Sequence, residues 1–377
     1  MPYDIPHTVS PGLWALAWRR LRGDRVAMIS LAIVALFLLL IALSAAGLVA
    51  KDWAREVGVN YAPPTFVGPD AANSSAAGAN ATSIAPDAVE NEVDREIPDP
   101  LADALAAIRA GATKPGEAPP GADKESVDPL ADVMADIKAK EGGRSDAATA
   151  RAATLPLGGD KWGRDVLKKT IKGSETSILV GIAAAIVAVA LGSVFGAVAG
   201  YYGRWLDDVF NWFYSVFTAI PYLLLILAVA AVLQQKGTLT IILILGLTGW
   251  TGVFRLIRGE YLKHKGREYV QAADAIGASN ARRMFVHILP NVSHVVLVQL
   301  SILTVAFIKS EVILSFLGFG VPVDVVSWGS MLNEAQNELI LGKWWQLAAA
   351  GTAMALLVTA FSLFTDALRD ALDPKLK

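Results

Sequence analysis

Small, polar and basic residues at positions 267–290 interrupt two strongly apolar stretches. Three apolar residues in this segment have the i, i+4, i+7 spacing of one helix face: Tyr269, Ala273 and Ile276. Gly277 is suited to end that helix in a left-handed conformation, Ser279 is suited to cap a second helix, and Pro290 stops or kinks it. On spacing alone, the segment is either a mere polar connector between two membrane spans or a helix pair with a role of its own.

Lys309 and Glu311 lie in the outer third of a predicted membrane span at 292–317. Ionisable groups inside a span are costly, so both are candidates for lining a transport pathway. The alternative is that their side chains snorkel to the membrane surface. Pro221 lies near the middle of another predicted span, where it should kink the helix. That kink either lines a pathway or only shapes the helix bundle.

Asp160, Arg164 and Asp165 form a charged group just before a long apolar stretch. We expect these three side chains to form an ion-pair cluster at the outer membrane surface. A structural role is favoured over contact with a substrate.

Several catalytic signatures are missing from the sequence. There is no G-x-x-x-x-G-K-[ST] loop to hold nucleotide phosphates, and no G-x-S-x-G nucleophile motif. The absence of Cys excludes disulfides, iron–sulfur clusters and thiol catalysis, and the four His lack the spacing of metalloprotease ligands. We therefore expect no catalytic residue, no metal and no cofactor, and we expect any ATP hydrolysis to reside on another polypeptide.

The composition predicts an integral membrane protein. The sequence is 54% hydrophobic and 18% charged, with a mean hydropathy of +0.46, which is too apolar for an ordinary soluble domain. The net charge of −2 gives no reason to expect nucleic-acid binding. Six apolar stretches are long enough to cross a bilayer: 26–50, 176–200, 209–233, 238–257, 292–317 and 345–367. In the second stretch, Gly192, Gly196 and Gly200 are spaced by four, and this ridge of small residues predicts close helix packing in lipid.

The basic residues predict the orientation of these spans. Clusters at 19–25, 255–267, 282–283 and 369–377 all face the cytoplasm only if there are six spans with both termini inside. The predicted fold class is therefore an all-α membrane protein with six transmembrane helices in an N-in/C-in arrangement. The amphipathic, Trp-containing segment before the first span would lie on the cytoplasmic face.

A large extracytoplasmic insert is predicted between the first two spans. Residues 51–155 are rich in Ala, Pro and acidic residues, which predicts partial disorder. A repeat at 99–109 and 128–138 predicts two short amphipathic helices, each with Asp at the N-cap and Pro at the first helical position. The favoured alternative is a solvated linker, because isolated helices of this length are marginal in water.

The sequence thus divides into three predicted parts. Residues 1–50 form the lead-in and first span, residues 51–155 the insert, and residues 156–377 a membrane core of five further spans. The core contains the cytoplasmic segment 267–290.

Four motifs resemble one family of membrane proteins. The first motif resembles the "EAA" loop of permease subunits of binding-protein-dependent ABC importers. It consists of Gln271-Ala272-Ala273, Gly277 and Ile288-Leu289-Pro290, with Gln271 in place of the usual Glu. Residues 157–166 resemble the "LGTDxxGRD" stretch of the oligopeptide/dipeptide branch. Residues 315–332 resemble that branch's "SFLGxGxxxPxxSWGxML" signature, and residues 368–374 its "LRDALDP" ending.

The resemblance assigns roles to particular residues. By it, the segment 267–290 is a coupling helix that docks on an ATP-hydrolysing subunit. The coupling residues it implies are Glu268, Tyr269, Gln271, Ala272, Ala273, Gly277, Ala278, Ser279, Leu289 and Pro290. The outer-face residues it implies are Asp160, Arg164, Asp165, Ser327, Trp328 and Gly329.

The implied function is that of a non-catalytic permease subunit of an ATP-driven importer in a prokaryotic inner membrane. The implied substrates are di- or oligopeptides, with nickel chelates or another small solute as an alternative within the branch. The implied partners are a second homologous permease, two ATP-binding subunits, an extracytoplasmic substrate-binding protein and membrane lipid. A passive channel would not need a docking loop, and an intramembrane enzyme would need paired catalytic residues deeper in the membrane.

Overall fold

The computed structural model describes residues 13–69 and 151–372. The predicted repeat helices at 99–109 and 128–138 lie outside the described residues. Within the described part of the chain the secondary structure is helical, with four isolated β-bridges and no strand. The helices are α1 (Leu13–Gly23), α2 (Arg25–Ala45), α6 (Val166–Tyr202), α7 (Arg204–Ala219), α8 (Tyr222–Leu233), α9 (Thr238–Thr248), α10 (Thr251–Lys265), α11 (Glu268–Ala275), α12 (Asn280–Arg282), the π-helical segment η1 (Arg283–Ile288), α13 (Leu289–Phe316), α14 (Trp328–Ile340) and α15 (Trp345–Leu372).

Four helical runs among the described residues are long and apolar enough to cross a membrane: Arg25–Ala45, Val166–Tyr202, Asn280–Phe316 and Trp345–Leu372. Two bent helix pairs, α7–α8 and α9–α10, pass the same test together, which raises the number of candidate spans to six. The chain is therefore an α-helical membrane protein with four to six candidate spans, in agreement with the coarse fold prediction.

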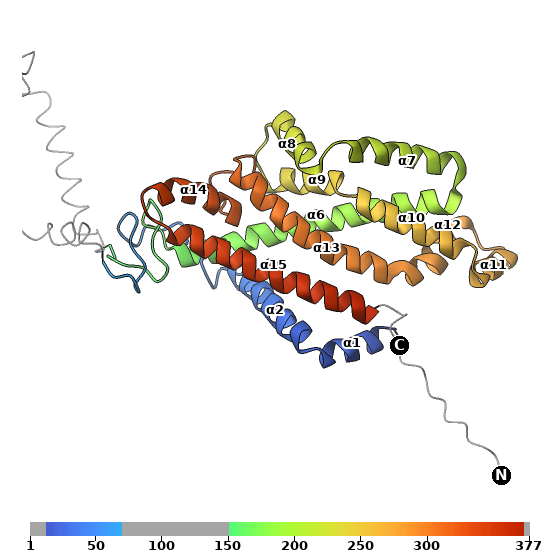
Figure 1. Cartoon of the computed structure of the whole chain (residues 1–377), viewed down its shortest axis with the longest axis horizontal. Helices are drawn as coiled ribbons and strands as arrows, with labels where there is room; N and C mark the ends of the chain where they lie inside the picture. Colours follow the sequence, from blue (N-terminus) through green and yellow to red (C-terminus); the bar gives the residue numbers. More distant parts are fainter. Residues whose placement is uncertain (1–12, 70–150, 373–377) are drawn as a thin grey trace, which may run out of the picture. The chain divides into compact units, whose positions relative to one another are not determined.

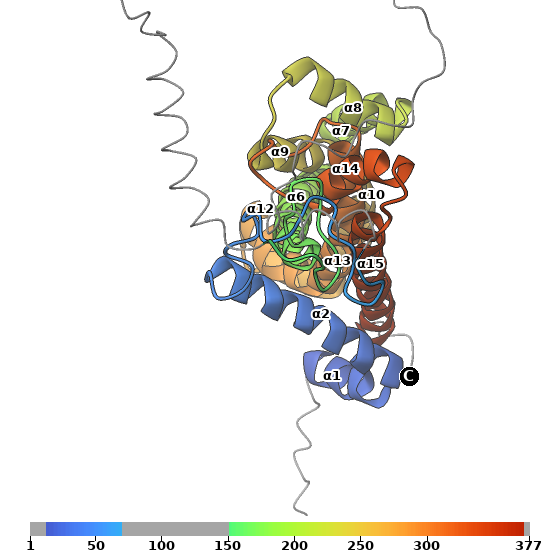
Figure 2. The same ribbon diagram turned by 90° about the vertical axis from the view of Figure 1, so that its left-hand side faces the viewer.

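The 37-residue helix α6 is the central element, and α2, α9, α10, α13, α14 and α15 all contact it. In both views α7 and α8 lie on one side of α6, and α1 and α2 lie on the other (Figures 1 and 2). Near its N-terminus α6 contacts α14, and near its C-terminus it contacts α7 and α10. We call the end of the helix bundle near the α6 N-terminus the α14 end. The opposite end, near the α6 C-terminus, is the α11 end.

A ridge of glycines holds α6 against α10. A Cβ atom at Gly192 would lie 2.7 Å from the Trp250 carbonyl oxygen, and one at Gly196 would lie 2.8 Å from that of Phe254. The two helix backbones therefore touch directly, as small residues spaced by four allow in lipid. This confirms the predicted packing role of the glycine ridge.

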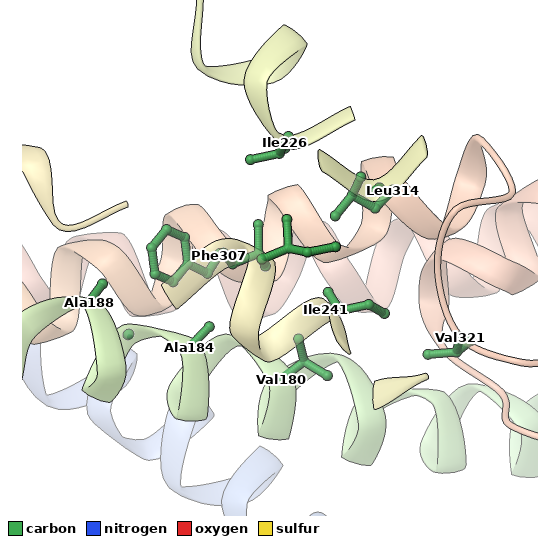
Figure 3. Packing of buried hydrophobic residues seen from close by; sticks show 12 residues of the cluster. Val180, Ala184, Ala188, Ile226, Ile241, Phe307, Leu314 and Val321 are labelled. Carbon is green, nitrogen blue, oxygen red and sulfur yellow. The ribbon is translucent and has the colours of Figure 1, made fainter. Parts of the chain in front are cut away.

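The largest apolar cluster joins α6 to three other helices. Val180, Ala184 and Ala188 of α6 face the other members of the cluster in Figure 3. The labelled members from the rest of the chain are Ile226 of α8, Ile241 of α9, Phe307 and Leu314 of α13, and Val321 of the following loop.

The predicted third span is broken rather than kinked. α7 ends at Ala219, α8 begins at Tyr222, and the two axes meet at 87°. The break is at Ile220 and Pro221, where Ile220 is extended (φ −99°, ψ 131°), because the residue before a proline disfavours the α conformation. The predicted kink at Pro221 is therefore a full break between two helices, which together pass the test for one bent span.

The predicted fourth span also consists of two helices. α9 and α10 meet at 41°, at Gly249 and Trp250. A Cβ atom at Gly249 would lie 2.3 Å from the ring of Phe307, so α13 packs directly against this bend. α10 then continues to Lys265, eight residues beyond the predicted end at 257.

Pro290 does not stop the helix that follows Ser279. The helical run continues from Asn280 to Phe316, and Pro290 lies in the first turn of α13. The preceding segment Arg283–Ile288 is π-helical. Proline lacks an N–H and crowds the preceding turn, and the wider turn of a π-helix accommodates it.

Residues 51–69 and 152–165 fold together next to the N-terminus of α6. Isolated bridges pair Gly58 with Ala152 and Pro64 with Leu155, and Val59 N–H donates to the Ala152 carbonyl at 3.0 Å. Trp345, at the start of α15, donates its ring N–H to the Gly159 carbonyl at 2.7 Å and is buried. We call this segment the loop cap. It closes the α14 end of the bundle.

Candidate functional site

The short helix α11 lies at the end of the bundle, between α10 and η1. Its buried side chains are Val270 and Ala273, and Val270 packs into an apolar cluster that includes Tyr261 and Met284. Ile276 just after the helix is 83% exposed, and Tyr269 is also exposed. The prediction that Tyr269, Ala273 and Ile276 form one apolar face is therefore wrong, because Ala273 is buried while the other two side chains are exposed.

The i, i+3 pair Val270 and Ala273 turns one helix face toward the protein's own core. Ala273 therefore lies under α11 rather than on a free surface. The residues of α11 and its C-cap that remain accessible to another protein are Glu268, Tyr269, Gln271, Ala272, Asp274, Ala275 and Ile276.

The turn after α11 has the predicted form. Gly277 has φ +81°, a left-handed conformation that glycine adopts without strain. Its N–H donates to the Asp274 carbonyl at 2.9 Å, and the Ala278 N–H donates to the Ala273 carbonyl at 3.0 Å. Ser279 then caps α12 by accepting a hydrogen bond from the Arg282 N–H at 3.4 Å. Helix, glycine turn and capped second helix are all confirmed.

Two tyrosines connect this end to the long helices. Tyr261 of α10 donates its hydroxyl to the Met284 carbonyl at 3.1 Å, and Tyr201 of α6 donates to Asn280 Oδ1 at 3.0 Å. Both rings are buried. Leu289 is half-buried and Pro290 exposed, so these two motif residues belong to the start of α13 rather than to the α11 surface.

The charged group at the α14 end differs from the predicted one. Asp160 forms an ion pair with Lys169 of α6 at 2.7 Å, and Lys169 also pairs with Glu334 of α14 at 2.5 Å. Gln346 of α15 accepts a third hydrogen bond from Lys169 at 3.2 Å. Lys169 and Asp160 are 2% and 0% exposed. We call Asp160, Lys169, Glu334, Glu338 and Gln346 the buried polar cluster.

The predicted ion pairs among Asp160, Arg164 and Asp165 are wrong. Asp160 accepts hydrogen bonds from the backbone N–H groups of Trp162 and Arg164, and not from the Arg164 side chain. Asp165 caps α6 by accepting from the Leu167 N–H at 2.9 Å. The Arg164 guanidinium instead lies 5.7 Å from the ring centroid of Trp53. Short polar loops favour these local backbone bonds over side-chain pairs.

Sequence reasoning did not identify Lys169 as a candidate functional residue. Its partners at 160, 334 and 346 come from three different elements, and no sequence spacing relates them. The available signal was a lysine one turn into a helix that becomes strongly apolar, since such a charge needs a buried partner.

Glu338, the remaining member of the buried polar cluster, is 1% exposed. One carboxylate oxygen accepts from the Lys161 N–H at 3.2 Å, and the other is buried without a hydrogen-bond partner. Burial raises the pKa of Glu338 to about 7, against the lowering effect of nearby Lys169. A carboxyl group with this pKa changes its charge near neutral pH.

Ser327, Trp328 and Gly329 fasten α14 to its neighbours. Ser327 forms a capping box with Ser330 at the start of α14. Trp328 is fully buried, and its ring N–H donates to the Thr170 carbonyl of α6 at 3.1 Å. A Cβ atom at Gly329 would lie 2.6 Å from the Val312 carbonyl oxygen, so only glycine allows this approach to α13.

The three pathway candidates lie in different surroundings. Glu311 is fully buried: one carboxylate oxygen accepts from Ser315 Oγ at 2.7 Å, and the other has no hydrogen-bond partner among the described residues. Glu311 is therefore packed inside the bundle and does not snorkel to the membrane surface. Lys309 is exposed on another face of α13, and Pro221 is exposed at the α7–α8 break.

Comparisons with known proteins agree with this geometry. A family model described as "Binding-protein-dependent transport system inner membrane component" matches residues 192–377. A second, described as "N-terminal TM domain of oligopeptide transport permease C", matches residues 12–64. The dipeptide transport system permease protein DppC of Bacillus subtilis is 38% identical over 221 residues, which cover 59% of this chain and 69% of that protein.

Two oligopeptide transport system permease proteins OppC show the same degree of similarity. The one from Bacillus subtilis is 36% identical over 221 residues, covering 59% of this chain and 72% of the relative. The one from Haemophilus influenzae is 34% identical over 219 residues, covering 58% and 70%. This chain belongs to the binding-protein-dependent transport permeases. It is a membrane-embedded transport subunit, and the family is one of inner-membrane components.

Membership of this family also accounts for the lack of catalytic motifs. A transport permease forms part of a membrane passage, and its site residues are those that position helices and partners. Of the residues grouped by the sequence motifs, the structure brings Ser327, Trp328, Gly329 and Asp160 together at the α14 end. It places Glu268 to Ser279 at the α11 end.

Proposed function

We propose that this permease takes di- or oligopeptides across the inner membrane as one half of an ATP-driven importer. The relatives named as dipeptide and oligopeptide permeases support the substrate class. The feature that carries the mechanism is α11, a short helix with an exposed outer face held by the ends of long membrane helices. Such a helix is suited to receive force from another protein and pass it to the bundle.

We assign the α11 end to the cytoplasm and count six spans, with α7–α8 and α9–α10 as one bent span each. The basic residues support this orientation, since membrane proteins concentrate Lys and Arg on the cytoplasmic side. Basic residues at this end come from α1, α10, the segment after α11, and α15: Arg19, Arg20, Arg22, Lys263, Lys265, Arg267, Arg282, Arg283 and Arg369. With six spans, both termini lie on the same side as α11.

The proposed assembly contains a second homologous permease, two ATP-binding subunits and an extracytoplasmic substrate-binding protein. Closure of the ATP-binding subunits displaces α11, and the displacement shifts the spans between two states with alternate access. ATP hydrolysis is on the partner subunits. Lys309 and Pro221 remain the candidates for contact with the pathway, because both are exposed and Glu311 is fully packed.

A pair of single-cysteine variants tests the orientation. Ile276 at the α11 end and Ile340 at the α14 end are both 83% exposed, and the natural sequence contains no Cys. In intact spheroplasts, a membrane-impermeant maleimide should label Ile340→Cys and leave Ile276→Cys unlabelled until the membrane is permeabilised. Labelling of Ile276→Cys from outside would contradict the assignment.

The same cysteine tests docking and transport. In the purified assembly, Ile276→Cys should cross-link to cysteines placed in the ATP-binding subunit, and Ile340→Cys should not. Proteoliposomes containing the whole assembly should accumulate labelled di- or tripeptides when ATP is supplied. Uptake of a nickel chelate without uptake of any peptide would overturn the substrate assignment and leave the coupling role intact.

A further inference from the structure

The last turn of α6 contains Tyr201, whose ring contacts two cations. Lys265 Nζ lies 5.5 Å from the centroid of the Tyr201 ring, and the Arg283 guanidinium carbon lies 5.9 Å from it. The hydroxyl donates to Asn280. Tyr201 is 5% exposed, so it is enclosed by the segment that follows α11 and does not serve as a membrane-surface anchor.

Arg283 extends this contact to α11. Its Nη1 forms an ion pair with Asp274 Oδ1 of α11 at 2.5 Å, and its Nη2 donates to Asn280 Oδ1. The side chain is 18% exposed. A planar guanidinium can hold a carboxylate at its edge and an aromatic ring on its face at the same time, which a lysine ammonium cannot do.

These contacts bridge a turn that has little packing of its own. A Cβ atom built at Gly277 meets nothing within 4 Å, and α11 buries only Val270 and Ala273. Asp274 and Arg283 lie on opposite sides of this turn, so their ion pair closes it. The stack on Tyr201 then fastens the closed turn to α6.

α6 is also the element through which a displacement would reach the far end of the bundle. From Tyr201 to Lys169 the helix spans about 48 Å at 1.5 Å per residue. Glycines of α6 touch α10, and Lys169 joins α6 to α14 and α15 in the buried polar cluster. A rigid helix packed in this way moves as a unit rather than bending locally.

We propose that Arg283 is a positioning residue that fastens α11 to the C-terminal turn of α6, so that displacement of α11 is transmitted along α6 to the α14 end. The inference rests on the proposed docking of α11 on an ATP-binding subunit. Arg283 does not touch substrate or nucleotide; it acts through Asp274 and Tyr201.

The experiment compares Arg283→Ala and Arg283→Lys with the matched control Arg282→Ala, an exposed neighbour. Each variant is reconstituted as the whole assembly in proteoliposomes and carries Ile276→Cys as the docking reporter. Peptide uptake and ATP hydrolysis are measured together. We expect hydrolysis and the Ile276→Cys cross-link to persist while uptake per ATP falls roughly 5- to 150-fold, the range of typical coupling free energies.

The lysine variant separates this role from simple charge pairing. Lysine keeps the positive charge near Asp274 and loses the stack on Tyr201, so Arg283→Lys should remain uncoupled, and Tyr201→Leu should reproduce its effect. Unchanged uptake per ATP in Arg283→Ala would overturn the inference and leave the docking role standing. Loss of the cross-link in Arg283→Ala alone would mean that Arg283 holds the docking position and transmits nothing. An absent cross-link in the otherwise wild-type reporter would overturn the proposed docking itself.

Discussion

The two ends of α6 hold their charged residues in opposite ways. At the α14 end, Lys169 and Asp160 are 2% and 0% exposed, and Lys169 joins them to two other polar side chains, Glu334 and Gln346. At the α11 end, Arg283 is 18% exposed and its partner Asp274 is 63% exposed. One end is a closed, buried polar cluster, and the other is a surface network around a glycine turn.

Because of this difference, the two ends differ in how easily they can be displaced. The buried ion pair between Lys169 and Asp160 is costly to open, because each charge would be left without a partner in a medium of low dielectric. Exposed polar contacts can break and re-form in water at little cost. The α14 end therefore holds α6, α14 and α15 together as one unit, and the α11 end is where a displacement can enter the bundle. Four predictions test this comparison.

The largest effect is expected at Lys169. Lys169→Met leaves Asp160 buried without its counter-charge, which should destabilise the fold by about 3–5 kcal/mol. The neighbouring Lys168→Met breaks only the exposed pair with Asp52, whose side chains are 35% and 48% exposed, and should cost about 0–1 kcal/mol. The apparent melting temperature of the detergent-purified protein measures both. Equal losses in the two variants would show that the α14 end is no more rigid than an ordinary surface.

The next effect concerns α6, which joins the two ends. Gly196→Ala places a methyl group 2.8 Å from the Phe254 carbonyl oxygen of α10, an overpacking that should cost about 1–3 kcal/mol. Gly259→Ala, on α10 itself, adds its methyl group where nothing lies within 4 Å and should stabilise the helix by about 0.5–1 kcal/mol. Opposite shifts in melting temperature are expected. If both variants melt alike, the close contact of the two backbones does not contribute to rigidity.

A smaller effect depends on pH at Glu338. The folded-state pKa of about 7 lies above the ordinary value of 4.5, so the folded protein binds this proton more tightly than the unfolded chain does. The stabilisation is fully present below pH 4.5 and is lost as the pH rises through 7. Glu338→Gln should therefore raise the melting temperature at pH 8 and leave it little changed at pH 5, with a gain on the order of 1 kcal/mol.

The surroundings of Glu338 set the control for this test. Asp160 and Glu334 also disfavour its charge, while Lys169 and the Lys161 N–H favour it. Glu268→Gln at the α11 end changes a carboxylate that is exposed to solvent and should not alter the pH dependence of melting. A melting temperature that depends on pH equally in wild type and Glu338→Gln would rule out Glu338 as the titrating group.

Local features of both ends could be predicted from the sequence, and their long-range contacts could not. Gly277 and Ser279 were predicted correctly because a helix end is decided by the residues next to it. The glycine ridge was predicted correctly because its spacing follows from the helical repeat. The partners of Lys169, at positions 160, 334 and 346, depend on how four elements meet, which no local pattern reports.

Two further errors have the same origin. The stripe of Tyr269, Ala273 and Ile276 has the right spacing, but Val270 with Ala273 forms an equally good stripe, and only the position of η1 decides which face is buried. The proline at 221 correctly marked a disruption. Its 87° angle is set by packing of α8 against α9 and the central cluster, and not by the proline alone.

The smallest effect on the melting temperature is expected from removing residues 70–150, which connect the two parts of the loop cap in the sequence. The described helices and the loop cap lie in one compact unit, which does not include residues 71–151. The chain on either side is joined by the bridge between Pro64 and Leu155 and by the Thr65 N–H, which donates to the Leu155 carbonyl at 2.9 Å. Replacing residues 70–150 with a short Gly/Ser linker should therefore leave the cap, the buried polar cluster and the melting temperature unchanged.

A variant lacking 57–67 as well removes the cap itself, exposes Trp345 and Gly159, and should lower the melting temperature clearly. If the first deletion were as damaging as the second, the rigidity of the α14 end would depend on the removed segment rather than on the contacts among the cap, α6 and α15.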